Sequence, residues 1–378
     1  MTTEFLFWLL LILGIYPYVL YPVFARLLAW VAGRGIDRKV FTPRISILIS
    51  AYNEAKHIEA TVRNKLAQDY TGEFEILVAS DGSTDGTDEI VTRLAQEDAR
   101  VRLYRQEPRQ GKTAALNKLI ELATGEIVIF SDANSLYRND TVRLLVENFA
   151  DPSVGYVTGK MVYVNADGSM VGDGCSAYMR YENWLRSIES SLGSIVGVDG
   201  GVDAVRRALY RPMTADQLPD FVLPLTVVGQ GKRVVYDERA LLQEDTLSDH
   251  DAEFRMRVRV ALRALWALRA ERMLLFGSAG LLFAWQLWSH KTLRYMSFLP
   301  LALACLLNVW LISAGPVYQL LLAGQVLFWL ATLLGRAGLT WAPIRFSLYF
   351  LLLNVASALA FARFLRGERI VTWQPRLG

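Results

Sequence analysis

Three short apolar runs in the first third of the chain each end in a cluster of polar, acidic and turn-forming residues. The runs and the clusters that follow them are residues 45–49 with 50–54, residues 75–79 with 80–87, and residues 127–130 with 131–134. Runs of this length, rich in Ile and Val and bounded by turn residues, predict buried parallel strands. Ligands bind beyond the carboxyl ends of the strands in open α/β sheets, so the clusters predict one site at that edge. Their carboxylates, near helix N-termini, suit a ligand with both hydroxyl and phosphate groups.

Helical patterns alternate with these runs. They cover residues 54–68, 85–95, 112–123, 176–191 and 216–230, with a glycine-rich loop at 197–201. In the first of them Ile58, Val62 and Leu66 recur every four residues and mark one buried face. Strands that alternate with helices predict a mostly parallel sheet with right-handed crossovers. The expected fold class is therefore α/β, in a domain over residues 44–250.

The N-terminal segment is strongly apolar. The chain as a whole is 53% hydrophobic with a mean hydropathy of +0.24, which is high for a soluble protein. Residues 5–31 contain only one charged residue, Arg26, and are long enough to cross a hydrocarbon core of roughly 30 Å. They lack a basic leader region and a cleavage site, so residues 1–33 predict a transmembrane anchor. The basic residues 34–44 place the following domain in the cytoplasm.

The last third of the chain also predicts membrane contact. Residues 251–290 are expected to form basic, amphipathic interfacial helices, residues 291–366 transmembrane helices, and residues 367–378 a tail. Three stretches, 293–312, 317–334 and 347–364, are each long enough to span. Residues 273–288 are shorter, and they either span or lie in the interface. Loop charges do not decide between these alternatives, and we favour the interface.

Charge and composition exclude several classes of protein. A net charge of +3 with no interleaved aromatic and basic residues excludes nucleic acid as a partner. Cys175 and Cys305 are far apart in the sequence, so they predict neither a disulfide framework nor a zinc site. His57, His250 and His290 are isolated from one another, which argues against a histidine metal site.

Two of the polar clusters contain groups suited to a phosphate ligand and its cation. Asp132 and Asn134 provide two hard oxygen donors, which suit Mg²⁺ or Mn²⁺ bound through few side chains and substrate phosphates. Lys112 supplies a positive charge at a helix start, where backbone N–H groups also favour phosphate. A Walker A loop at residues 111–113 is excluded, because Gln106 stands where the upstream glycine is required.

In this order, residues 51–54, 80–87, 111–112 and 131–134 resemble the nucleotide-sugar half of family-2 glycosyltransferases. Membrane-bound members, such as relatives of cellulose and hyaluronan synthases, are the most similar in layout. The resemblance covers residues 44 to 270, and the apolar flanks fit it. It implies a GT-A fold, a Rossmann-like domain with a mixed, mostly parallel sheet flanked by transmembrane helices. It also implies inverting transfer from a nucleotide diphosphate sugar, usually UDP-linked, with Mg²⁺ or Mn²⁺.

The same resemblance implies roles for individual residues. The residues expected to bind the nucleotide sugar are Tyr52, Asn53, Glu54, Asp81, Lys112 and Asp132, with Asp81 on the uridine. Asp132 and Asn134 stand at the metal motif. The family pattern there is commonly Asp-X-Asp, so Asn134 is a departure that supplies one less negative charge and is expected to weaken metal binding.

Inversion requires a base that faces the acceptor hydroxyl, opposite the departing diphosphate. The family usually places this base in a Thr-Glu-Asp motif before a helix. The matching residues 217–221 keep only the final Asp, so the resemblance assigns Asp220 as the base. Capping of the helix is the alternative role for Asp220, and Asp216 is the competing carboxylate.

Two further motifs match less completely. Processive synthases usually carry a Gln-X-X-Arg-Trp motif, whereas residues 253–259 contain neither the Gln nor the Trp. Arg257 and Arg259 are the residues expected in the diphosphate-binding role, and a basic helix face on anionic lipid is the alternative. Asp199 and Gly200 match the acceptor-side loop of such enzymes, with a plain turn as the alternative.

The sequence therefore predicts an inverting glycosyltransferase of the inner (cytoplasmic) membrane, multi-pass, with its catalytic domain in the cytoplasm. Its expected acceptor is lipid-linked or a polysaccharide, in exopolysaccharide or cell-envelope glycan synthesis. Membrane lipids and exopolysaccharide assembly proteins are the further partners expected. The alternatives are a processive synthase that extrudes its own polymer and a non-catalytic, nucleotide-binding scaffold.

Overall fold

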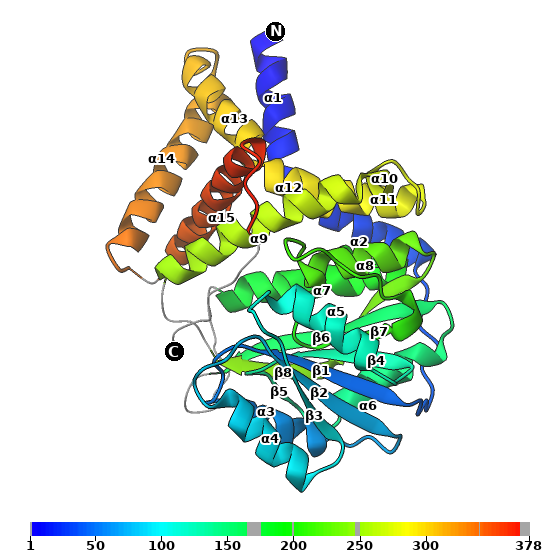
Figure 1. The fold of residues 1–378 in the computed structure, drawn as a ribbon. Helices are drawn as coiled ribbons and strands as arrows, with labels where there is room; N and C mark the ends of the chain where they lie inside the picture. The colour runs from blue at the N-terminus through cyan, green and yellow to red at the C-terminus, as the bar shows by residue number, and fades with distance from the viewer. Residues whose placement is uncertain (1, 165–174, 199, 246–249, 340, 371–378) are drawn as a thin grey trace.

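An α/β domain built on one mixed sheet lies beneath a layer of helices, from which apolar helices of both chain ends project (Figure 1). The computed structural model describes residues 2–164, 175–198, 200–245, 250–339 and 341–370. Asp199, predicted to belong to the acceptor-side loop, lies outside the described residues.

Within the described residues, the sheet has eight strands in the order β3-β2-β1-β4-β7-β6-β8-β5. Their bounds are β1 Ile45–Ala51, β2 Phe74–Ser80, β3 Val101–Arg105, β4 Ile127–Asp132, β5 Leu136–Tyr137, β6 Val154–Val164, β7 Asp203–Arg206 and β8 Arg233–Asp245. Strands β3, β2, β1 and β4 are parallel neighbours, whereas β7 is antiparallel to both β4 and β6. The three strands predicted from the apolar runs are confirmed as β1, β2 and β4. The sequence pattern missed β3.

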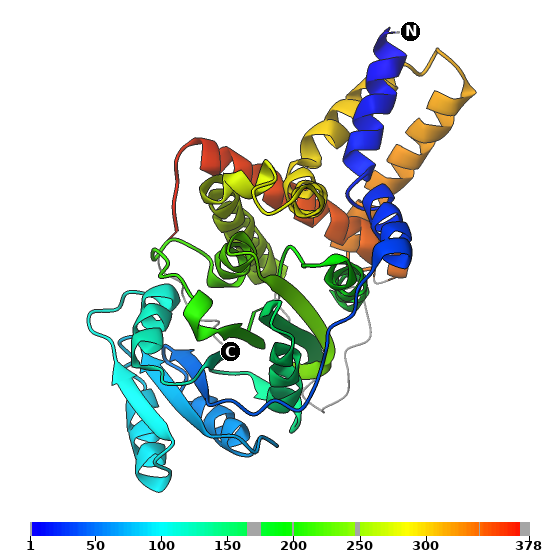
Figure 2. The same cartoon turned by 90° about the vertical axis from the view of Figure 1, so that its right-hand side faces the viewer.

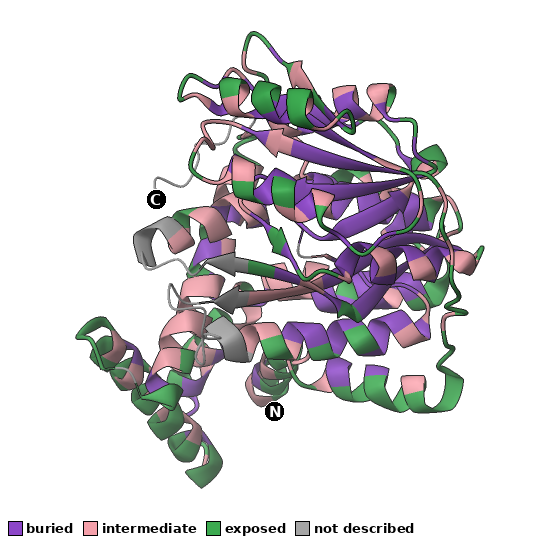
Figure 3. Ribbon diagram, turned by 90° about the horizontal axis from the view of Figure 1, so that it is seen from below, coloured by how far each residue is buried: buried purple, intermediate pink, exposed green. Residues whose placement is uncertain are grey.

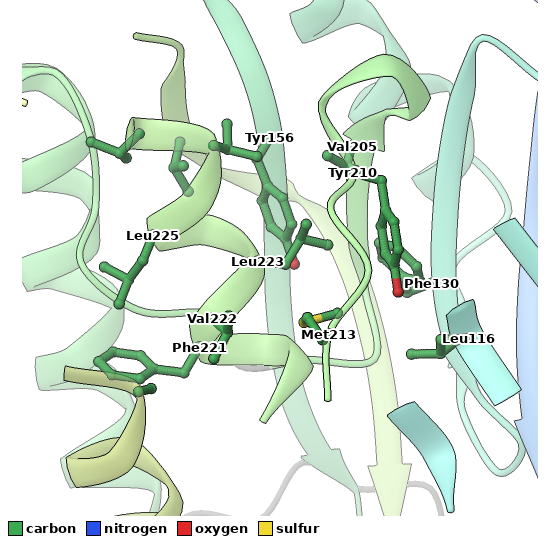
Figure 4. Packing of buried hydrophobic residues seen from close by; sticks show 14 of the residues in the cluster. Leu116, Phe130, Tyr156, Val205, Tyr210, Met213, Phe221, Val222, Leu223 and Leu225 are labelled. Carbon is green, nitrogen blue, oxygen red and sulfur yellow. The ribbon is translucent and has the colours of Figure 1, made fainter. Parts of the chain in front are cut away.

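Helices cover both faces of the sheet. One face is covered by α3 (Ile58–Leu66), α4 (Thr87–Glu97) and α6 (Thr141–Glu147), and the other by α5 (Lys112–Leu122) and α8 (Pro219–Gly229), with the short turns η1 (Asn148–Ala150) and η2 (Arg207–Leu209). Side chains alternate along each strand, so Ile47 and Ile49 of β1 pack with α3 and Leu48 packs with α5. Figure 4 shows Leu223 of α8 in the same cluster as Tyr156 of β6. Burial on both faces explains why these strands read as continuous apolar runs.

A second layer of helices lies on α7 and α8. The bounds of α7 are Cys175–Leu192. The layer consists of α2 (Leu20–Ala32), α9 (His250–Ala270), α10 (Arg272–Leu275), α11 (Leu281–Leu287), the π-helix η3 (Trp288–Thr292) and α12 (Leu293–Met296). Phe283 and Leu287 of α11 belong to the core cluster of the domain. Residues 281–287 therefore pack on the domain, and the interfacial position expected for residues 273–288 stays a prediction.

The remaining apolar helices project away from the sheet (Figure 2). They are α1 (Thr2–Ile15), α13 (Phe298–Trp310), α14 (Pro316–Arg336) and α15 (Ala342–Leu365). Among the described residues, α14 and α15 are long and apolar enough to cross a membrane. Many of the large side chains of these helices are exposed, for example Leu320 and Leu333 of α14. Figure 3 shows that the strands, in contrast, are mostly buried. Exposed apolar helices of this kind are typical of a membrane-associated protein.

The N-terminal segment differs from the single anchor expected over residues 1–33. Helices α1 and α2 pass the test for a span only as a pair, and a bend of 60° separates them. The bend falls at residues 16–19, where Pro17 has no N–H to continue the helix. Helix α1 alone measures about 21 Å, which is shorter than a hydrocarbon core. The stretch expected as a span at residues 293–312 is likewise divided, with a bend of 56° before α13.

Leu185→Ala is expected to lower the free energy of unfolding by about 2–5 kcal/mol, because truncating a buried core side chain leaves a cavity. Leu185 is fully buried on α7 and packs in one cluster with Tyr21 and Ala25 of α2. Denaturant unfolding in detergent, followed by tryptophan fluorescence, measures the change. Ser187→Ala on the exposed face of the same helix is the control, expected within about 0.5 kcal/mol of wild type. Equal stability of Leu185→Ala and wild type would show that α2 does not stabilise the domain.

Candidate active site

The polar clusters meet at the carboxyl edge of the parallel strands. Ser50 of β1 lies opposite Asp132 of β4, and Ala51 lies opposite Ser80 of β2. Strands in register end at the same level, so residues far apart in the sequence become neighbours. The edge predicted from the three apolar runs therefore exists as one surface.

The first two clusters are locked together by Asn53. Its Oδ1 accepts the backbone N–H of Thr84 at 2.9 Å, and its own backbone N–H donates to Ser83 Oγ at 3.1 Å. Asn53 has a φ of 54°, in the left-handed region that Asn tolerates better than most residues. The backbone N–H of Glu54 donates to Thr87 Oγ1 at 2.9 Å. Both residues thus shape the loop after β2, and direct contact with a nucleotide stays a prediction for them.

Asp81 is buried beneath the loop of residues 106–111. One carboxylate oxygen accepts Gln106 Nε2 at 2.5 Å and the backbone N–H of Gln110 at 2.9 Å, and the other accepts the N–H of Gly111 at 2.9 Å. The guanidinium of Arg109 stacks on the ring of Tyr52, with its carbon 3.5 Å from the ring centre. Tyr52 and Asp81 therefore lie at one edge under a shared loop. The contact expected between Asp81 and uridine is a prediction that requires this loop to leave room for a base.

Lys112 and Asp132 form the centre of the site. Lys112 is the first residue of α5 and Asp132 the last of β4, and Nζ lies 2.6 Å from Oδ1. Both side chains keep access to solvent, at 35% and 39% exposure. Burial alone would lower the pKa of Lys112, but the carboxylates of Asp132, Asp220 and Asp203 outweigh it and raise that pKa above its ordinary value. The lysine is therefore positively charged at neutral pH.

Two glycines allow the carboxylate of Asp220 to lie near Asp132 and Lys112. A Cβ on Gly200 would lie 2.8 Å from the carboxylate of Asp220, and a Cβ on Gly201 would lie 3.4 Å from Asp132 Oδ2. Their φ angles of 81° and 76° also favour glycine. The loop of residues 200–201 thus passes between Asp132 and Asp220, which are 88 positions apart in the sequence. The sequence resemblance grouped these residues, and the structure brings them together.

The structure separates the two carboxylates that competed for the role of base. Asp220 stands in the first turn of α8, which begins at Pro219, and its charge acts on Lys112. Asp216 precedes the helix and binds Thr214 Oγ1 at 2.7 Å and Arg369 at 2.7 Å. Asp220 is therefore the carboxylate that faces the centre of the site.

Two residues of the site were missed by sequence reasoning. Asp203 opens β7 in a buried position, hydrogen-bonds Tyr156 and acts on Lys112. A carboxylate inside the apolar run of residues 202–205 was the available signal. Arg263 of α9 donates to the carbonyl oxygens of Asp216 at 3.1 Å and of Gln217, just before α8. Its spacing in a basic helix gave no signal.

The arginines that the sequence favoured lie elsewhere on α9. Arg257 donates to the hydroxyl of Tyr349 on α15 at 2.7 Å and to Glu253 at 3.3 Å. It therefore joins α9 to the apolar bundle in the structure. Arg259 is half-buried on the same helix, and its role in diphosphate binding stays a prediction.

Helix α3 holds the segment that carries Asn134. Thr61 Oγ1 donates to the carbonyl of Ala133 at 2.7 Å. Lys65 Nζ donates to the carbonyl of Ser135 at 2.6 Å and lies 3.5 Å from the ring centre of Tyr137. Side chains of α3 thus hold the segment between β4 and β5 in place, and Asn134 within it is half-buried.

Only a small set of oxygen donors is available for a cation. No group of three or more His, Cys, Asp or Glu side chains that could hold a metal occurs within the described residues. The carboxylate of Asp132, which binds Lys112 through Oδ1, and the amide oxygen of Asn134 are the candidate donors. Mg²⁺ and similar ions bind through one or two carboxylates plus phosphates and water, so the donor set fits such an ion when a phosphate ligand is present.

Comparison with known families agrees with this geometry. Residues 46–174 match the model of glycosyl transferase family 2, and this part of the chain is a family-2 glycosyltransferase domain, as the resemblance predicted. The relatives described next are named as glycosyltransferases or as glycolipid and polysaccharide synthases.

Three relatives illustrate the range of similar proteins. A β-monoglucosyldiacylglycerol synthase of Nostoc sp. is 31% identical over 168 residues, 44% of this chain and 36% of the relative. An N-acetylglucosaminyltransferase of Azorhizobium caulinodans is 28% identical over 193 residues, 49% and 48% of the two chains. A poly-β-1,6-N-acetyl-D-glucosamine synthase of Staphylococcus aureus is 37% identical over 116 residues, 30% and 28%. The chain matches less than half the length of each of these relatives.

One solved structure matches nearly the whole chain. The mannosyltransferase PcManGT of Pyrobaculum calidifontis, solved with GDP-mannose and Mn²⁺, aligns with a TM-score of 0.75 at 24% identity. The alignment covers 97% of this chain and 99% of that one. It confirms the GT-A fold, and the likeness extends to the helices at both ends.

Lys65→Met is expected to flatten the rise of stability with pH. Burial lowers the pKa of Lys65 well below its ordinary value, an effect that Asp132 only partly opposes. Between that lowered value and roughly 10.4, the unfolded chain binds more protons than the folded chain, so the free energy of unfolding rises with pH. Unfolding measured at about pH 7 and about pH 10 should show a larger gain for wild type than for Lys65→Met. Lys232→Met, on the surface, is the control, and identical pH dependence in all three proteins would contradict the expectation.

Proposed function

We propose that the chain transfers a sugar, with inversion, from a nucleotide diphosphate sugar to a lipid-linked or glycan acceptor at the cytoplasmic face of the membrane. The observation that carries the proposal is the junction of Lys112, Asp132 and Asp220 at the carboxyl edge of the sheet. A lysine, the carboxylate at the metal motif and the base candidate around one point support the three roles that such a transfer requires. The named activities of the relatives, in glycolipid and exopolysaccharide synthesis, support the same reaction class.

The donor is expected to bind along the edge from β2 to β4. For the base to bind there, it would replace Arg109 on the ring of Tyr52 and a loop N–H at the carboxylate of Asp81. We expect a UDP-linked sugar, as in the family at large. The diphosphate then faces the first turn of α5, where Lys112 supplies its charge and backbone N–H groups point outward. Lys112 exchanges its ion pair with Asp132 for one with phosphate in this arrangement.

Asp132 and Asn134 are the residues that would hold Mg²⁺ or Mn²⁺. A divalent ion there supplies charge neutralisation for the leaving diphosphate. PcManGT, the neighbour of similar fold, was solved with Mn²⁺ and a nucleotide sugar, which supports a divalent ion for this chain. The neutral amide of Asn134 replaces a second carboxylate at this position.

Asp220 is expected to act as general base on the acceptor. Its carboxylate takes the proton of the acceptor hydroxyl, while the hydroxyl oxygen forms the new bond to the anomeric carbon. The bond from that carbon to the diphosphate breaks, and the diphosphate leaves with the electron pair. The acceptor enters opposite the diphosphate, so the configuration inverts. Phe221, next to Asp220, packs in the cluster shared with α11, which supports entry of the acceptor from the side of that layer.

Asp220→Asn is expected to lower transfer by about 10²–10⁴-fold, the usual contribution of a general base. The protein in nanodiscs is supplied with UDP-sugars, GDP-mannose, Mg²⁺ or Mn²⁺ and a bacterial lipid extract, and nucleotide diphosphate release is measured. Asp216→Asn is the matched control and should keep wild-type activity, since its carboxylate binds Thr214 and Arg369. If wild type and Asp220→Asn release nucleotide at the same background rate, the scaffold alternative replaces this proposal. A product longer by many sugars on a defined acceptor supports the processive alternative.

Asn134→Asp is expected to lower the Mn²⁺ concentration for half-maximal activity by about tenfold, because a second carboxylate adds charge beside the ion. Asp132→Asn should raise that concentration or abolish activity. Asn139→Asp adds the same charge at an exposed position and is the control. An unchanged Mn²⁺ dependence in Asn134→Asp would place the ion away from this loop.

A further inference from the structure

A lysine from the membrane-side layer reaches the acceptor side of the catalytic domain. Lys291 belongs to η3, a π-helix outside the residues that match the family model. Its Cε and Nζ both lie 2.6 Å from the position that a Cβ on Gly197 would occupy. Its Nζ lies 5.9 Å from the ring centre of Phe221. Gly197 precedes Gly200 in the same loop, and Phe221 follows Asp220 in the first turn of α8, so Lys291 lies on the side of the domain where these two segments meet.

No hydrogen bond or ion pair ties Lys291 to any other residue in the part of the chain that the structure describes. The nearby carboxylates are already engaged. Glu182 binds Arg294 at 2.5 Å and His290 at 3.3 Å, while Glu189 binds Tyr21 at 2.5 Å and His290 at 2.7 Å. Lys291 is thus a half-buried cation, and the carboxylates that act on it, Glu182 and Glu189, bind other partners.

The surroundings favour an incoming anion. Arg186 and Arg294 act on Lys291 together with Glu182 and Glu189, so three cations face two carboxylates. Both carboxylates belong to α7, within the layer that joins the domain to the apolar helices. A half-buried ammonium without a partner costs free energy that an anionic ligand would offset. A lysine ammonium is a compact point charge well suited to phosphate.

We propose that Lys291 binds a phosphate ester carried by the acceptor and holds the acceptor hydroxyl beside Asp220. The proposal rests on the function proposed above and narrows it to acceptors that carry a phosphate. A neutral acceptor, such as a diacylglycerol, would leave the ammonium unpaired. Gly197 takes part because any side chain at that position would displace Lys291 from the site. The position of η3, next to the apolar helices, favours a phosphate attached to a lipid.

The test measures transfer in nanodiscs of phosphatidylcholine with the donor that wild type uses. Three acceptors are compared, namely phosphatidylglycerol, which carries a phosphate ester and free hydroxyls, dioleoylglycerol, which carries a hydroxyl and no phosphate, and glucose 1-phosphate. Lys291→Met is expected to raise KM for phosphatidylglycerol by about tenfold or more, the loss of one charge-assisted hydrogen bond. The donor KM and the acceptor-independent hydrolysis of the donor should not change, because Lys112 and Asp132 are intact. Lys291→Arg should retain most of the wild-type affinity.

Lys39→Met is the matched control, since it removes an exposed lysine that pairs with Asp37 at 2.7 Å. It should leave KM unchanged, which separates a built site from general attraction to charged lipid. Use of dioleoylglycerol with no use of either phosphate acceptor would overturn the proposal while leaving the proposed function intact. An unchanged KM in Lys291→Met would overturn it as well. Use of glucose 1-phosphate with the same dependence on Lys291 would support the phosphate site and assign it to a soluble source.

A binding measurement keeps the inference testable without turnover. Dodecyl phosphate should raise the melting temperature of wild type and have a smaller effect on Lys291→Met, because a ligand that binds the folded state stabilises it. Inorganic phosphate in the same assay distinguishes free phosphate from lipid-borne phosphate. Equal shifts in both proteins would contradict the inference. Absence of nucleotide release from every donor, together with a Lys291-dependent shift, would overturn the proposed function and leave the phosphate site standing.

Discussion

The ion pair between Lys112 and Asp132 is the interaction on which the arrangement of the site depends. It joins the start of a helix on one face of the sheet to the end of its neighbouring central strand. Three carboxylates act on this one lysine, so the pair balances a cluster of negative charge that would otherwise repel itself. Because both side chains keep access to solvent, the pair can be exchanged for a ligand pair at modest cost. A bound diphosphate and a divalent ion would satisfy the lysine and the carboxylates separately.

The parts of the fold that the sequence predicted are those with a strong local pattern. The runs at β1, β2 and β4 are buried on both faces, which makes them continuously apolar and easy to recognise. Strand β3 lies at the edge of the sheet, so Arg102 and Arg105 alternate with its apolar residues and conceal it. The bend at Pro17 was visible as a residue type, but its angle is set by packing of α2 on α7. Hydropathy shows how long the apolar stretch of α1 and α2 is, but not that it bends.

The site residues divide in the same way. Asp81, Lys112 and Asp132 follow recognisable strand ends, and the structure gathers them at the edge where they were expected. Asp203 and Arg263 are placed by tertiary packing alone, because β7 is inserted beside β4 from far along the chain and α9 is laid over α8 by its buried face. A spacing rule cannot show which of several arginines on one helix faces inward. The structure selects Arg263 and turns Arg257 toward α15.

The packing of α2 on α7 has a consequence for the size of the molecules that can react. Buried side chains hold α2, α9 and α11 on the domain. Helix α2 follows α1 in the chain, and α9 packs against α15. The base candidate is therefore held at a fixed distance from the projecting apolar helices. A lipid-linked acceptor of the kind proposed above would have to span that distance between its lipid and its hydroxyl. The enzyme would then select acceptors by the length between lipid and hydroxyl, in addition to their chemistry.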